Sequence, residues 1–255
     1  MRRPSKLPAV DERLIAPETR YEIIDGRVLY VPPADEPHGT CHSKLSALLE
    51  CHKAEGYSTA SDMLTRTSET GDMAPDASVY PSARNPETGG RQLEELAFEI
   101  ASTQAISEVA TKAARLSERG VRRVFALDLK KSRALEWSAE TGRWKPLPRG
   151  TAIEDRCLAA PLPVDALLDS TSSDDANARA LLAKGNPVLE AAHRDIRSEA
   201  DLEARAEILF MLLAGKKLRV SPAQATKIRA ASRDDLDRWI ARAATVATTA
   251  KLLSL

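Results

Sequence analysis

The chain has 255 residues, of which 43% are apolar, and its 37 basic side chains balance its 37 acidic ones. This length and apolar content allow one main domain with a small appendage and exclude a wholly disordered chain. A formal charge of zero is no argument for or against a nucleic-acid partner, so only local charge bears on that question.

Targeting signals are weak throughout the sequence. No stretch approaches the roughly 18–20 apolar residues of a membrane span, so we expect no membrane partner. The basic start is followed by prolines where a signal peptide needs an apolar run. The three cysteines, Cys41, Cys51 and Cys157, suit a reducing compartment better than a disulfide framework. We therefore expect a cytoplasmic protein.

The first part of the chain predicts a β-hairpin followed by a helix. Residues 21–31 hold two β-rich runs around an Asp-Gly pair, which suits a tight hairpin turn. Two prolines end the second run, because neither can donate to a sheet. Residues 38–55 then place leucines at spacings of three and four, which predicts a helix.

The middle of the chain predicts strands around one amphipathic helix. Strand-like segments follow in this order: 60–67, 77–80, 96–100, 121–129, 135–138 and 143–147. Residues 106–119 carry an apolar stripe at helical spacing, and Gly120 is their stop signal. This order favours an α/β fold with a mixed central sheet flanked by helices.

The last third predicts a linker and a small C-terminal helical appendage. Residues 169–177 (DSTSSDDAN) are polar and lack periodicity, which is typical of a linker. Ser198, Ser221 and Ser232 each precede a helical pattern as candidate N-terminal caps. We therefore predict a main domain over residues 1–168, a linker over 169–197 and a helical domain over 198–255.

Two acidic residues lie in strand contexts that predict burial. Asp76 opens the run Ala-Ser-Val-Tyr, and Glu99 lies within Leu-Ala-Phe-Glu-Ile. A buried carboxylate costs several kcal/mol unless it is paired or binds a cation. Two carboxylates on neighbouring strands repel each other, so one takes up a proton or a divalent ion holds both.

Lys112 lies on the next predicted helix, at the edge of its apolar stripe, from which its ammonium could reach both carboxylates. Two carboxylates, a hard cation and a lysine can together hydrolyse phosphodiesters. Ordinary interpretations stay open. Asp76 could begin a strand after a turn, Glu99 could face solvent on an edge strand, and Lys112 could pair with Glu108 one helical turn away.

Five stretches, in order, carry a resemblance to a known family. They are Tyr21-Glu-Ile-Ile-Asp-Gly-Arg-Val28, Pro33 with His38, Pro75-Asp-Ala-Ser-Val79, Phe98-Glu-Ile-Ala-Ser102, and the run from Lys112 through Gly120 to Asp128. Over about residues 15–168 the chain resembles the Uma2 (DUF820) family of PD-(D/E)XK nucleases. The resemblance implies a restriction-endonuclease-like mixed sheet between helices.

The resemblance also implies a metal site for Mg²⁺ or Mn²⁺. It implies Asp76 and Glu99 as metal ligands, with the Ile100 carbonyl as a third. Lys112 matches the lysine that this family carries on the helix after the Glu strand, and Glu22 matches an acidic residue of the first hairpin that faces the site.

His38 matches a histidine of the family. Three positions depart from its pattern: Thr103 stands where the family usually has proline, Leu116 where it has an aromatic residue, and Phe125 where it has tryptophan. None of the three is an implied ligand. The departures leave open a catalytically inactive copy of the fold.

Three further signals are weaker. Residues 112–133 hold eight basic and two acidic residues, and this excess predicts either phosphate contacts or a solvated surface. His42 and Cys51 are nine residues apart and out of phase on one helix, which argues against a zinc site. The basic tail over 216–242 could contact DNA, dimerise or pack on the main domain.

These inferences favour a Mg²⁺-dependent endonuclease that acts on DNA, by analogy with the family, and related nucleases that pair suggest a homodimer. The alternative is an inactive module of the same fold that binds nucleic acid or a protein partner. Acyl hydrolysis is disfavoured, because the sequence has no Gly-x-Ser-x-Gly motif.

Overall fold

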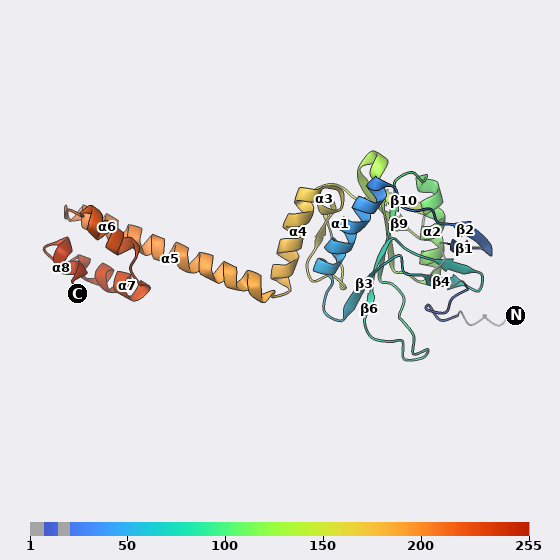
Figure 1. Cartoon of the computed structure of the whole chain (residues 1–255), viewed down its shortest axis with the longest axis horizontal. Coiled ribbons are helices and arrows are strands. Elements are labelled where there is room, and N and C mark those ends of the chain that lie inside the picture. Colours follow the sequence, from blue (N-terminus) through green and yellow to red (C-terminus); the bar gives the residue numbers. More distant parts are fainter. Residues whose placement is uncertain (1–7, 15–20, 255) are drawn as a thin grey trace. The chain divides into compact units, whose positions relative to one another are not determined.

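The computed structural model describes residues 8–14 and 21–254. The chain divides into two compact units between Lys184 and Gly185. Within the described ranges the first unit holds the sheets and helices α1 to α4, and the second is entirely helical (Figure 1). No helix among these residues is long and apolar enough to cross a membrane.

A six-stranded sheet forms the centre of the first unit, in the order β10-β9-β8-β7-β6-β3. Its strands are β3 (Tyr57–Ser61), β6 (Ala77–Pro81), β7 (Leu96–Ala101), β8 (Arg123–Asp128), β9 (Arg133–Ser138) and β10 (Arg143–Pro146). β7 and β8 are parallel, and the other neighbours are antiparallel. The predicted α/β fold with a mixed central sheet is confirmed.

Helices α1 (Glu36–His52) and α2 (Ile106–Arg119) pack on the two faces of this sheet. Successive side chains of a strand point to opposite faces. Phe98 and Ile100 of β7 therefore pack with leucines of α1, whereas Ala97 and Ala101 pack against α2. Glu99 lies between the two alanines and shares the face that α2 covers.

A second sheet has the order β2-β1-β5-β4. Its strands are β1 (Tyr21–Ile24), β2 (Arg27–Tyr30), β4 (Thr65–Ser68) and β5 (Gly71–Met73), and a small ribbon pairs β11 (Ala152–Ile153) with β12 (Leu162–Pro163). The predicted first hairpin is confirmed, with Asp25 and Gly26 both at positive φ in its turn. The strand predicted over 60–67 is instead the end of β3 and the start of β4.

Residues 169–197, predicted as a linker, are mostly helical in the structure. Helix α3 (Val164–Leu168) is followed by α4 (Ser170–Ala183), whose N-terminus the Asp169 carboxylate caps by accepting from the Ser172 amide. α4 packs on α1 through small side chains, since its buried residues are Ser173, Ala176 and Ala180. Such small residues leave no periodicity of large apolar side chains in the sequence.

The second unit contains α5 (Pro187–Gly215), α6 (Pro222–Arg229), α7 (Arg233–Ala243) and α8 (Thr249–Leu253) around its own core. Ser221 and Ser232 cap α6 and α7 as predicted. The helix start predicted at Ser198 is wrong. α5 begins eleven residues earlier, where Asn186 caps it and Pro187 opens it.

Candidate metal and catalytic site

Three acidic residues lie next to one another across neighbouring strands. The register of β3 with β6 and that of β6 with β7 both include Ala77. One position before Ala77, the same registers align Asp62, Asp76 and Glu99. The Asp62 amide donates to the Asp76 carbonyl at 3.3 Å, which ties the first two together. Residues far apart in sequence thus form a row across the sheet, just after the end of β3, just before the start of β6 and within β7.

The structure brings Lys112 of α2 to Glu99 and Glu22. Lys112 Nζ lies 2.9 Å from Glu99 Oε2 and 3.1 Å from Glu22 Oε1. It also donates to the Ala74 carbonyl at 3.1 Å. Glu22 Oε1 also accepts a hydrogen bond from the Ala74 amide, at 2.7 Å. All three ionisable side chains are more than four-fifths buried, so the ammonium is a fixed part of the site.

Asp76 lies beside this group and contacts the residue that follows Glu99. Asp76 Oδ2 accepts from the Ile100 amide at 2.5 Å, and Asp76 Oδ1 lies 3.3 Å from His38 Nε2. The sequence predicts the Ile100 carbonyl as a metal ligand, whereas the contact described here is made by its amide. His38 lies in the first turn of α1, so Asp76 is contacted both by this helix and by β7.

Burial and neighbouring charges shift the pKa values of Glu99, Lys112 and Asp76. Burial raises the pKa of Glu99 to about 8, because its effect is larger than the lowering caused by the Lys112 ammonium. Burial lowers the pKa of Lys112, but Glu99, Glu22 and Asp76 outweigh it, so that pKa is raised and the ammonium stays charged. The pKa of Asp76 is lowered, because His38 and Lys112 outweigh its burial.

At this site, one buried carboxylate oxygen lacks a hydrogen-bond partner among the described residues. Glu99 Oε1 is shielded from solvent and accepts no hydrogen bond within the described residues. Such an oxygen is costly unless it gains a proton or a cation. Carboxylate oxygens from Glu99 and Asp76 are the ligands that hard divalent cations prefer. The residues present therefore fit the divalent cation that the sequence implies.

A histidine adds a second group of metal-ligating atoms that the sequence reasoning missed. One ligand atom each of His42, Asp62 and Asp76 lie within 4.8 Å of one another. The spacing of His38 and His42, one helical turn apart, is the signal that could have found them. The zinc site considered from the sequence drew on histidines and cysteines alone, and the spacing of His42 and Cys51 argued against it. Asp62 gave no signal, because it falls within a predicted strand.

Residues 7–163 match the model of a family, Uma2, described as "Putative restriction endonuclease". The chain belongs to the Uma2 family. Membership supports nuclease function in general, and it confirms the resemblance that the motifs predict. No curated protein matches this chain.

Among solved structures, this Uma2 chain is similar to a "putative nuclease" of DUF820 from Anabaena variabilis ATCC 29413. The two sequences are 15% identical, with a TM-score of 0.49. The match covers 58% of this chain and 89% of the other.

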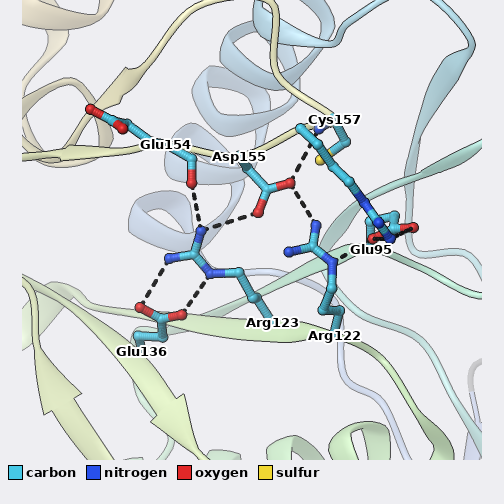
Figure 2. Close-up of polar contacts among 8 residues, drawn as sticks. Glu95, Arg122, Arg123, Glu136, Glu154, Asp155 and Cys157 are labelled. Carbon is cyan, nitrogen blue, oxygen red and sulfur yellow. Dashed lines mark hydrogen bonds and ion pairs between the residues drawn. The ribbon is translucent and has the colours of Figure 1, made fainter.

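The basic residues around β8 of this Uma2 chain form ion pairs. Arg122 and Arg123 both contact Asp155, and each binds a second carboxylate, Glu95 for Arg122 and Glu136 for Arg123 (Figure 2). Further along, Arg115 pairs with Asp25 and Glu118, and Arg133 with Asp128. Most of the predicted basic excess is thus neutralised within the unit, which argues against phosphate contacts by these paired residues.

A cavity of about 780 Å³ in this Uma2 chain is lined by none of these carboxylates. It is lined by residues of α1 such as Thr40, Lys44 and Ala47, and by the first turns of α4. These α1 residues point away from the helix face that carries His38 and His42. The candidate ligands and Lys112 therefore lie outside this cavity.

Proposed function

We propose that this protein is a metal-dependent endonuclease that hydrolyses phosphodiester bonds of DNA. Asp76 and Glu99 hold a Mg²⁺ or Mn²⁺ ion, with the Ile100 carbonyl as a third ligand. The observation that carries the proposal is the buried Lys112 ammonium at 2.9 Å from Glu99, whose other oxygen has no partner among the described residues. Carboxylates beside a fixed cationic donor suit phosphoryl chemistry.

The chain's own residues have separate tasks in this proposal. Lys112 exchanges one of its three present contacts for a hydrogen bond to the attacking water or to the developing charge on the phosphate. Glu22 contacts the same ammonium at 3.1 Å and helps to hold it in place. When bound, the divalent ion lowers the pKa of water and neutralises charge on the phosphate. The water attacks phosphorus in line and gives up its proton to solvent, while the bond from phosphorus to the leaving ester oxygen breaks and that oxygen takes up a proton. None of the described residues of the site is placed as a covalent nucleophile.

A cleavage assay with matched lysine variants tests the proposal. Supercoiled plasmid is incubated with Mg²⁺ or Mn²⁺ and the wild type, Lys112→Ala or Lys131→Ala. Lys131 is exposed and lies outside the site. We expect nicking by the wild type and by Lys131→Ala, and a loss of about 100-fold or more in Lys112→Ala. Equal cleavage by all three would place the activity elsewhere or in a contaminant.

The same reaction with single-stranded RNA of matched sequence tests the choice of DNA. A melting experiment tests the ion independently of cleavage. Mn²⁺ should raise the melting temperature of the wild type but not of Asp76→Ala. Binding of DNA without cleavage, and without this metal effect, would favour the inactive module instead.

A further inference from the structure

Helix α1 directs two histidines at the acidic end of the sheet. His38 and His42 are four residues apart, so they share one helix face, and their rings stack with centroids 6.1 Å apart. His38 Nε2 lies 3.3 Å from Asp76 Oδ1. His42 Nε2 lies 3.5 Å from Asp62 Oδ1. Two histidines at this spacing on one helix face can bind the same metal ion.

The His42 contact is too loose for an ordinary hydrogen bond. Its Nε2 atom is buried and has no hydrogen-bond partner within the described parts of the chain. A buried imidazole nitrogen left unpaired is costly. Two ligands of a tetrahedral zinc ion, each about 2.1 Å from the metal, lie about 3.4 Å apart. The 3.5 Å between His42 and Asp62 matches that separation.

The strands place the third ligand at the same point. Asp76 lies beside Asp62 in the register of β3 with β6, and its ligand atom is within 4.8 Å of the other two. The Asp62 side chain is 70% exposed, which leaves the group open to ions from solvent. A shift of about 1 Å in the side chains would complete a three-ligand site.

We propose that His42, Asp62 and Asp76 bind a divalent transition-metal ion of the Zn²⁺ class, at a position separate from that between Asp76 and Glu99. The nitrogen ligand selects the class of metal, because imidazole suits zinc and related ions, whereas Mg²⁺ prefers oxygen ligands and retains water. Asp76 lies between the two positions, and its two oxygens allow it to serve both. The new site does not need Glu99, Lys112 or nuclease activity.

Metal binding to the full-length protein tests this site directly. Co²⁺ replaces Zn²⁺ as a visible probe and is titrated with Mg²⁺ in excess, so that oxygen-only sites are already filled. We expect one Co²⁺ per chain, displaced by Zn²⁺. His42→Ala and Asp62→Asn should each weaken its affinity about 100-fold. The matched controls His193→Ala and Asp175→Asn, both of exposed residues, should leave it unchanged.

Two variants separate this proposal from the nuclease. Glu99→Gln and Lys112→Ala should lose plasmid cleavage yet keep the Co²⁺ spectrum. Because Asp62 is exposed, Asp62→Asn keeps the test valid even if His42→Ala proves unstable, and circular dichroism checks the fold of each. Absence of Co²⁺ binding in the wild type, or unchanged affinity in a folded Asp62→Asn, would overturn the proposed site whatever the outcome of the cleavage assay.

Discussion

Replacing Glu99 by glutamine should stabilise the metal-free protein. Glu99 is buried, and burial raises its pKa from 4.5 to about 8. The folded state therefore resists ionisation of this carboxyl, while the unfolded state does not. The stability that the protonated Glu99 carboxyl contributes is fully present below pH 4.5 and is lost progressively as the pH rises to about 8. Glutamine has no charge to develop, so it should remove this loss.

The size of the effect follows from the same pKa. At pH 9 the carboxyl is ionised in both states, and the change from 4.5 to about 8 corresponds to about 5 kcal/mol. The glutamine amide is a poorer partner for Lys112 than a carboxyl, which reduces the gain. We expect Glu99→Gln to raise the free energy of unfolding by about 2–4 kcal/mol at pH 9 and by less than about 1 kcal/mol at pH 5.5.

Urea unfolding at both pH values measures this difference. Trp137 and Trp144 report on the first unit, and a Trp239→Phe background removes the signal of the second. Mg²⁺ should stabilise the protein that carries Glu99 at pH 9 and not the glutamine variant. A glutamine variant no more stable than its parent at pH 9, or an equal gain at both pH values, would refute the reasoning.

Two further substitutions test the scaffold. Burial raises the pKa of Asp155, but hydrogen bonds from Arg122, Cys157 and Arg123 outweigh it and hold that pKa well below its usual range, so this carboxylate stabilises the fold above about pH 4 and less as the pH falls further. Asp155→Asn should lower the free energy of unfolding by about 2 kcal/mol at pH 7 and flatten the acid limb of a melting-temperature profile; an unchanged profile would show that the pairs contribute nothing. Gly120→Ala should cost about 1–2 kcal/mol in urea unfolding, because φ is 116° there and an added Cβ would lie 3.3 Å from Leu93; a neutral result would mean that the turn relaxes freely.

Local patterns were enough to predict the elements that carry the site. The stripe over 106–119 predicts α2 with the bounds that it has, because a left-handed glycine ends it. The Asp-Gly pair predicts the first hairpin for a similar reason, since its turn needs positive φ. Burial of Glu99 also followed from the sequence, because apolar neighbours surround it on a central strand.

Other features depend on contacts between distant segments, and these leave little trace in the sequence. Asp62 has a φ of 50° and separates two strands that join different sheets. The sequence of this segment nevertheless has the pattern of one continuous strand. α4 is buried through Ser173, Ala176 and Ala180, which look polar or neutral in a composition count. The basic segment after Lys112 suggested a nucleic-acid surface, because its acidic partners come from elsewhere in the chain.

The ion pairs of Lys112 also limit when this cluster can form during synthesis of the chain. Glu22 and Lys112 are 90 positions apart in the chain, and Glu99 reaches the ammonium only once β7 is in the sheet. A ribosome-bound fragment that ends before α2 therefore has its acidic side chains but no counter-charge for them. The three-residue cluster can therefore form only after α2 has been synthesised.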